Sequence, residues 1–290
     1  MYIFGISCYN NYVMNIREPC LPVGWYPGEK NKIEEFLKPF SSNGGSSAAI
    51  APHAGWFFSG SLAAQAVSSL DSKADTVAVI GGHLPKNMPI LIAKEDGVKT
   101  NYGSMKIDRE LRMEFEKQLL EKKQSPQSDR YNDNTVEVLL PMVNYFFPRS
   151  ELLWLRFPAN ISSFDAGIIL YESALALGRH LVVLASVDLT HYGDNYGITH
   201  KGTGKAALDW VKNVNDALLI KAILSGDPAL ILKLAEDDRS SCSAGAILGA
   251  LGFVKNNGKQ AKLLEYSTSA DINGDLSPSS FVGYAAISFQ

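Results

Sequence analysis

The sequence predicts a single α/β domain, because short apolar runs of strand length alternate with segments of helix length along all 290 residues. No linker and no shift in composition divides the chain, so we predict one domain over residues 1–290. Moreover, three of the five histidines directly follow strand-like apolar runs. In an open α/β sheet, ligands bind at the carboxyl ends of the strands. The same pattern therefore predicts both a fold and a site.

The predicted helices are recognised by apolar spacing, small residues and caps. The first presents Ile33, Phe36 and Leu37 on one face, the second is rich in alanine, and the third begins at an Asp108 cap. In chain order, the predicted helices cover residues 27–40, 60–70, 108–122, 135–146, 163–177, 203–224, 228–235 and 242–254.

The predicted strands are short apolar runs that lie between these helices or after the last of them. In chain order they cover residues 48–51, 76–80, 89–93, 152–157, 181–187, 261–267 and 282–289, with hairpin-like strands over 98–107 and a polar loop over 124–133. We expect the strands that end near Ala51, Ile80 and Val187 to finish at one edge of the central sheet.

Composition excludes several classes of protein. A net charge of −3 provides no basic field for nucleic acid or anionic lipid, and no apolar stretch is long enough to span a bilayer. The first ten residues have no signal-peptide pattern. Three cysteines without regular spacing argue against a disulfide framework and predict a reducing, cytoplasmic location.

Two histidines occupy glycine-containing turns after predicted strands. His53 lies in Pro-His-Ala-Gly and His83 follows Gly81 and Gly82. Glycine permits close approach of the backbone to a metal or ligand. Each histidine alone could be a hydrogen-bonded turn residue, but recurrence at strand ends favours a shared site.

A carboxylate and an imidazole follow a third strand. Asp188 and His191 are three residues apart, so both can face one side of a turn. An aspartate can orient a histidine for proton transfer or beside a metal. The alternative is a helix-capping aspartate with an incidental histidine.

Cys242 and Glu137 complete the candidate set. Cys242 lies at the predicted first turn of a helix, where a thiolate is stabilised and can act as a nucleophile or a metal ligand. Glu137 interrupts an apolar helical run, so we expect a buried or cleft-facing carboxylate with a partner. The remaining histidines, His180 and His200, are interpreted as surface or structural residues, and Cys8 and Cys20, which have no partner among the candidate residues, as structural.

Together the motifs resemble the MEMO family, called AmmeMemoRadiSam system protein B in prokaryotes, over roughly residues 15–290. The matching motifs are Arg17-Glu18-Pro19, Gly24-Trp25-Tyr26-Pro27, Ala51-Pro52-His53-Ala54-Gly55, Ser59-Gly60, Gly81-Gly82-His83, Ser186-Val187-Asp188-Leu189-Thr190-His191-Tyr192, Cys242, Tyr266-Ser267-Thr268-Ser269 and Val282-Gly283-Tyr284. The resemblance implies a central mixed sheet flanked by helices, similar to the class III extradiol dioxygenase (LigB-like) fold.

The resemblance also implies a metal site. Its ligands would be His53, His83 and Cys242, with Asp188 and His191 alongside, and the implied metal is iron or copper. Two imidazoles and a thiolate also suit zinc. The chain departs from the family pattern at three places: Asn134 replaces a histidine, Gly82 a proline and Ser243 a glycine. We therefore expect the lining of the pocket to differ.

Three functions remain open at this point. The first is a metal-dependent oxidoreductase or accessory protein, with Asp188, His191 and Glu137 as the catalytic side chains. The second is a metal-independent hydrolase or transferase with Cys242 as nucleophile, His191 as base and Asp188 as orienting residue. The third is a non-catalytic module that binds a peptide or small molecule in the cleft. The family resemblance also implies a radical-SAM protein as partner.

Overall fold

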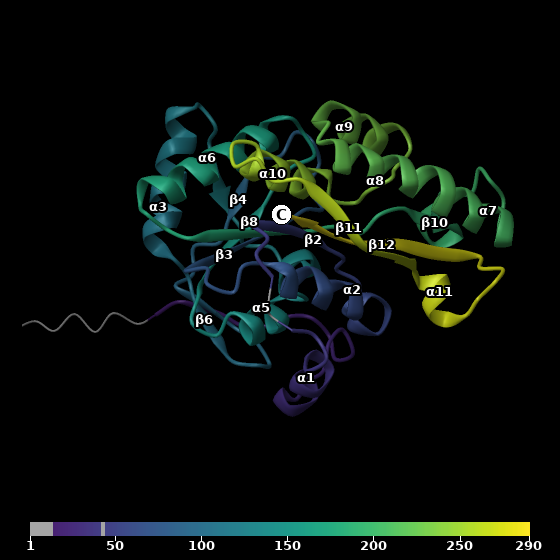
Figure 1. Ribbon diagram of the computed structural model, residues 1–290, viewed down its shortest axis with the longest axis horizontal. Helices are drawn as coiled ribbons and strands as arrows, with labels where there is room; N and C mark the ends of the chain where they lie inside the picture. Colours follow the sequence, from purple (N-terminus) through teal and green to yellow (C-terminus); the bar gives the residue numbers. More distant parts are fainter. Residues whose placement is uncertain (1–13, 42–43) are drawn as a thin grey trace, which may run out of the picture.

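The computed structural model describes residues 14–41 and 44–290, and it contains one large mixed sheet with helices on both faces (Figure 1). The helices are α1 (Lys30–Leu37), α2 (Trp56–Ser69), α3 (Arg109–Glu121), α4 (Asn134–Glu137), α5 (Leu140–Phe146), α6 (Ser162–Ala176), α7 (Gly204–Trp210), α8 (Asp216–Ser225), α9 (Pro228–Asp237), α10 (Ala244–Val254) and α11 (Ser269–Asn273). The strands are β1 (Ile16–Arg17), β2 (Ala48–Ala51), β3 (Thr76–Gly81), β4 (Leu91–Ile92), β5 (Gly97–Lys99), β6 (Ser104–Lys106), β7 (Gln127–Ser128), β8 (Glu151–Arg156), β9 (Leu181–Ser186), β10 (His191–Gly193), β11 (Ala261–Thr268) and β12 (Ser280–Phe289).

The large sheet has the order β10-β12-β2-β9-β3-β8-β4-β7, and β11 pairs with β12. Strands β2, β9, β3 and β8 are mutually parallel, whereas β12 and β4 join this group antiparallel. The predicted α/β fold with a mixed sheet is therefore confirmed. Ala51 pairs with Ser186, and Ile80 pairs with Ala185. The three predicted strand ends thus lie side by side at one edge.

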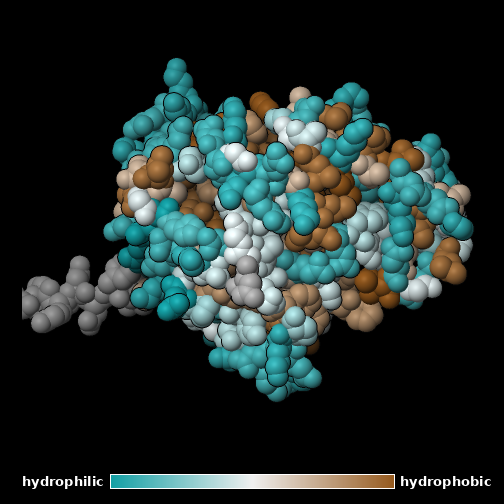
Figure 2. Space-filling model, in the orientation of Figure 1, coloured by the Kyte–Doolittle hydropathy of each residue, from teal (hydrophilic) through white to brown (hydrophobic). Residues whose placement is uncertain are grey.

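Helices bury apolar residues against both faces of this sheet (Figure 1). Helices α3, α6, α8, α9 and α10 contribute to one core cluster, and α1, α2 and α5 contribute to the other. Helix α1 illustrates the pattern, because Ile33 and Leu37 are fully buried while its charged residues face outward. Figure 2 shows this hydrophilic outer side at the bottom of the molecule. No described helix is both long and apolar enough to cross a membrane.

Several boundaries differ from the sequence prediction. The predicted helix over 135–146 is broken into α4 and α5, with Pro141 in the first turn of the second. The predicted helix over 203–224 contains a π-helical turn, Val211–Asn215, between α7 and α8. Part of the predicted loop over 124–133 pairs with β4 as strand β7. The sequence analysis also missed the short elements β1, β10 and α11.

Helices α6 and α10 cross at glycine contacts that leave no space for side chains. A Cβ added to Gly167 would lie 2.1 Å from the carbonyl oxygen of Gly249 and 2.8 Å from the amide nitrogen of Phe253. We expect Gly167→Ala to force the helices apart and to lower the free energy of unfolding by about 1–3 kcal/mol. Urea unfolding measures this loss. Gly28→Ala is the control, since nothing lies within 4 Å of a Cβ there; equal stability of the two variants would contradict the prediction.

Candidate metal centre

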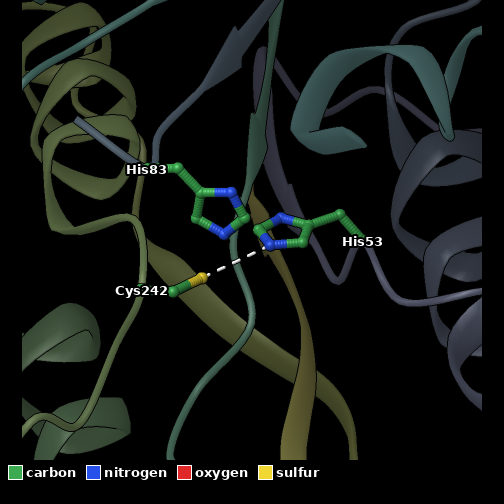
Figure 3. Close-up of side chains that lie close together, drawn as sticks. All are labelled: His53, His83 and Cys242. Carbon is green, nitrogen blue, oxygen red and sulfur yellow. Dashed lines mark hydrogen bonds between the residues drawn. The ribbon is translucent and has the colours of Figure 1, made fainter. Parts of the chain in front are cut away.

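His53, His83 and Cys242 converge from three separate segments of the chain. His53 follows β2, His83 follows β3, and Cys242 precedes α10. One potential ligand atom from each residue lies within 4.8 Å of the other two. Figure 3 shows the three side chains pointing toward one another. The predicted group is therefore assembled in a geometry that could hold one metal ion.

Both imidazoles are oriented through Nδ1. His53 Nδ1 is 2.9 Å from Ser186 Oγ, while its Nε2 lies 3.3 Å from Cys242 Sγ. His83 Nδ1 is 3.2 Å from Asp133 Oδ2, which leaves Nε2 turned toward Cys242 (Figure 3). Metal-binding histidines commonly use the second nitrogen in this way, because the outer partner fixes the ring and raises its basicity. The two Nε2 atoms are thus prepared to bind a cation.

The backbone at His83 adopts an unusual conformation. Its φ of 57° lies in the left-handed region, which residues other than glycine rarely occupy. The preceding Gly82 packs directly against Ser243, and a Cβ there would lie 2.7 Å from the Ser243 Cα atom. Because strained backbone concentrates at functional sites, this turn supports a role for His83 beyond packing.

The neighbours of Cys242 favour its thiolate form. Burial opposes ionisation, but the charge on His53 and contacts with His191, His53 and His83 keep the pKa of the Cys242 thiol well below its usual range. Contacts with Asp133 and Cys242 outweigh the effect of burial on His83 and raise its pKa to about 10. Helix α10 begins at Ala244, so our sequence prediction that Cys242 lies in the first helical turn was wrong. The imidazoles, rather than that turn, activate the sulfur.

Asp188 and His191 border the same group. The buried Asp188 carboxylate accepts a hydrogen bond of 2.8 Å from the amide of His53, and its other oxygen lies 3.7 Å from His191 Nε2. That nitrogen is buried and has no hydrogen-bond partner among the described residues. Despite burial, Asp188 and Cys242 raise the pKa of His191 to about 10. Asp188 can therefore orient His53 and stabilise a charged His191.

Glu137 is buried, as the sequence analysis expected, but it does not join the metal group. Its carboxylate accepts hydrogen bonds from the amides of Cys20 and Leu21 and from the hydroxyl of Tyr26. It also accepts one from Cys20 Sγ at 2.8 Å. Glu137 thus anchors the segment before α1, and Cys20, which we expected to have no such partner, is part of that anchor. Cys8 lies outside the described residues.

The other two histidines lie apart from the metal group. His180 is exposed and its Nε2 lies 3.3 Å from Asp71 Oδ2. His200, also exposed, packs edge-on against Trp210 at a ring separation of 4.8 Å. Their interpretation as surface or structural residues agrees with these positions.

A cleft of about 770 Å³ opens beside the histidines, and we call it the main cleft. Its lining includes His53, His83, Asp188 and His191 together with neutral polar and aromatic side chains, and it contains no lysine or arginine. Asn134, which replaces the family's histidine, also lines this cleft and donates to the His53 carbonyl oxygen. A volume of this size accommodates a small organic molecule or a short peptide segment.

Three supporting residues were not predicted from the sequence: Asp133, Ser186 and Arg156. Asp133 orients His83 and forms an ion pair of 3.1 Å with Arg156, which also lies 3.5 Å from Asp129. Asp133 was assigned to a polar loop, and no local pattern distinguishes it from other loop aspartates. Ser186 is the last residue of β9, so its position at the site edge was the available signal.

Asp133→Asn is expected to weaken metal binding by about 10–100-fold, as loss of an outer partner of a ligand histidine typically does. The asparagine side chain is neutral, so the variant lacks the negative charge that polarises the imidazole of His83. Titration with Fe(II) or Cu under anaerobic conditions measures the affinity. Asp75→Asn is the matched control, because the Asp75 carboxylate accepts a hydrogen bond from the backbone amide of His180, far from the metal group. An unchanged affinity for Asp133→Asn would show that this pair does not support the site.

The fold and the site define an α/β protein with a thiolate–imidazole group that could bind a metal. Comparison with known families then identifies the chain: the family model described as Memo-like protein matches residues 17–288, so the chain belongs to the Memo-like family. A MEMO1 family protein of Pyrococcus abyssi is 30% identical over 94% of this chain and 98% of its own length. One from Thermococcus onnurineus is 26% identical over 95% and 99%. An uncharacterized Escherichia coli K12 protein superposes with a TM-score of 0.49 at 11% identity, covering 84% of this chain and 99% of that one.

Proposed function

We propose that this chain is a metal-dependent redox protein, either an enzyme or an accessory protein, that holds iron or copper between His53, His83 and Cys242. The observation that carries the proposal is the convergence of these three donors. The Nδ1 atoms of the two histidines contact Ser186 and Asp133, and these contacts orient the Nε2 atoms toward the group. Two imidazoles and a thiolate form a borderline-soft set that fits Fe(II), copper or zinc and leaves a coordination position open. Iron or copper bound there would supply one-electron chemistry.

The protein's own residues have separate tasks in this proposal. Asp188 holds the backbone of His53 and faces His191, so this pair can retain a proton next to the main cleft or move one at His191 Nε2. The main cleft provides room for a small molecule or peptide beside that nitrogen. Association with a radical-SAM protein is a further proposal that rests on the family resemblance.

The metal-independent alternative with His191 as base and Asp188 as orienting residue fits the geometry less well. In a cysteine–histidine–aspartate triad, the two imidazole nitrogens face opposite partners, one the nucleophile and the other the carboxylate. Here the Asp188 carboxylate lies near Nε2 of both His191 and His53. In each ring this is the same nitrogen that would have to accept the proton of the Cys242 thiol. This arrangement argues against His191 and Asp188 as the base and orienting residue of Cys242, whereas His83, with Asp133 at Nδ1 and Cys242 on the side of Nε2, is the imidazole that such a triad would use.

Elemental analysis with EPR spectroscopy, on protein purified anaerobically and never exposed to chelator, tests the proposal. We expect stoichiometric iron or copper with a signal perturbed by thiolate. If zinc is the metal found, the metal site is supported but the proposed redox role is not. Absence of metal, together with an activity that chelators do not affect, would instead support Cys242 as a nucleophile.

A further inference from the structure

Cys242 lines a second cavity that is separate from the main cleft. This second cavity has a volume of about 400 Å³ and lies between the segment after β3, the β8–α6 connection, helix α9 and the start of α10. Its lining shares no residue with that of the main cleft. His53, His83 and His191 line the main cleft and not the second cavity, whereas Cys242 lines the second cavity and not the main cleft. Cys242 therefore lies in the partition between the two.

The walls of the second cavity are mostly apolar. Ala159 and Ile161 form one side, Leu232 and Ala235 of α9 form another, and Ala244 lies next to Cys242. Leu232 and Ala235 are only partly buried against the core, so this apolar surface is not fully used by folding. A cavity of this size and character is within the range of small-molecule sites.

The polar groups of the second cavity already have protein partners. Lys86 and Glu236 form an ion pair with each other across two segments of its lining. Asn160 donates to the Lys86 carbonyl oxygen and accepts from the amide of Ser162, and Ser241 Oγ donates to the Asp188 carbonyl oxygen. The two charged side chains of this lining, Lys86 and Glu236, lie at its exposed rim and pair with each other, so the inner walls offer no charge to a ligand and an uncharged one is favoured.

We propose that the second cavity binds a small, uncharged and largely apolar molecule, and that it gives access to Cys242 independently of the main cleft. The His53–Cys242 contact of 3.3 Å then places such a molecule next to the candidate metal centre without passing the histidines. The inference concerns access and binding, so it does not depend on which metal the protein holds or whether it holds one.

Thiol-labelling rates test this access route on the full-length, chelator-treated chain. The probes are ethyl methanethiosulfonate and its 2-sulfonatoethyl and 2-(trimethylammonium)ethyl counterparts, which share one reacting group and differ in charge. Each rate is divided by that of free cysteine, and peptide mass mapping reports Cys242 separately from Cys20. We expect the uncharged reagent to label Cys242 faster than either charged one.

Matched variants separate the two cavities. Ala235→Phe fills the second cavity, and Asn273→Trp fills the main cleft from its exposed rim. Because a close-packed interior leaves no path for a reagent, Ala235→Phe should slow Cys242 labelling by about tenfold or more, whereas Asn273→Trp should change it by less than about twofold. Ala159→Leu, from another wall, replaces Ala235→Phe if that variant does not fold. Two results would overturn the proposal. One is that Asn273→Trp slows the labelling of Cys242 as much as Ala235→Phe or Ala159→Leu does, and the other is that charged and uncharged reagents label Cys242 at equal rates.

Discussion

Cys242→Ser is expected to abolish the proposed metal binding while leaving the fold intact. A serine hydroxyl stays protonated at neutral pH and is a far poorer ligand for a borderline-soft ion than a thiolate. The affinity for iron or copper should fall by roughly 100-fold or more, beyond the about 10–100-fold typical of losing an outer partner. Metal content is measured after gel filtration, and circular dichroism checks that the fold is intact.

Cys20→Ser is the matched control for this experiment. Cys20 donates through its sulfur to Glu137, and a serine hydroxyl can make the same hydrogen bond. The control should keep full metal content. Retention of full iron or copper occupancy by Cys242→Ser would mean that the proposed ligand set is wrong.

The second large effect concerns Asp216, a fully buried carboxylate at the start of α8. Burial raises its pKa to about 6, although hydrogen bonds from Thr190 and Tyr266 oppose the shift. In the unfolded chain the pKa is near 3.8. Because the folded value is the higher one, the stabilisation is complete below about pH 3.8 and is lost as the pH rises through about 6.

Relative to Asp216→Asn, the native chain should therefore lose about 3 kcal/mol of unfolding free energy between acidic and neutral pH. Chemical denaturation of both proteins across this range measures the difference. Other carboxylates, such as Asp188 with its lowered pKa, change stability in the opposite direction but are common to both proteins. Asp209→Asn, at an exposed position on α7, is the control for removing a surface carboxylate. A constant difference between Asp216→Asn and the native chain would contradict the prediction.

The alternation of strands and helices, the edge at which β2, β3 and β9 end, and the members of the metal group could all be predicted from sequence. The strands, the helices and the two histidines depend on local signals. Apolar runs report burial, and His53 and His83 follow such runs directly. Cys242 is different, because its helix begins two residues later than predicted. The helix prediction made Cys242 a candidate nucleophile or metal ligand, and the resemblance to a known family then implied that it is a ligand alongside the two histidines.

Side-chain partners could not be predicted in this way. Asp133 contacts the imidazole of His83, which is 50 residues away in the sequence. Glu137 lies outside the metal group and accepts hydrogen bonds from Cys20 and Tyr26. Nothing near either carboxylate in the sequence indicates which imidazole, amide or hydroxyl it will contact.

The order of residues was enough to establish the α/β class and to predict that imidazoles meet at a sheet edge, because both follow from periodicity and from the direction of parallel strands. Only the tertiary structure decided which nitrogen of each histidine faces the sulfur, and why that sulfur is a thiolate. It also decided that Cys242 separates two cavities. These properties depend on distances of a few ångströms between segments far apart in the chain, and local patterns carry no information about such distances.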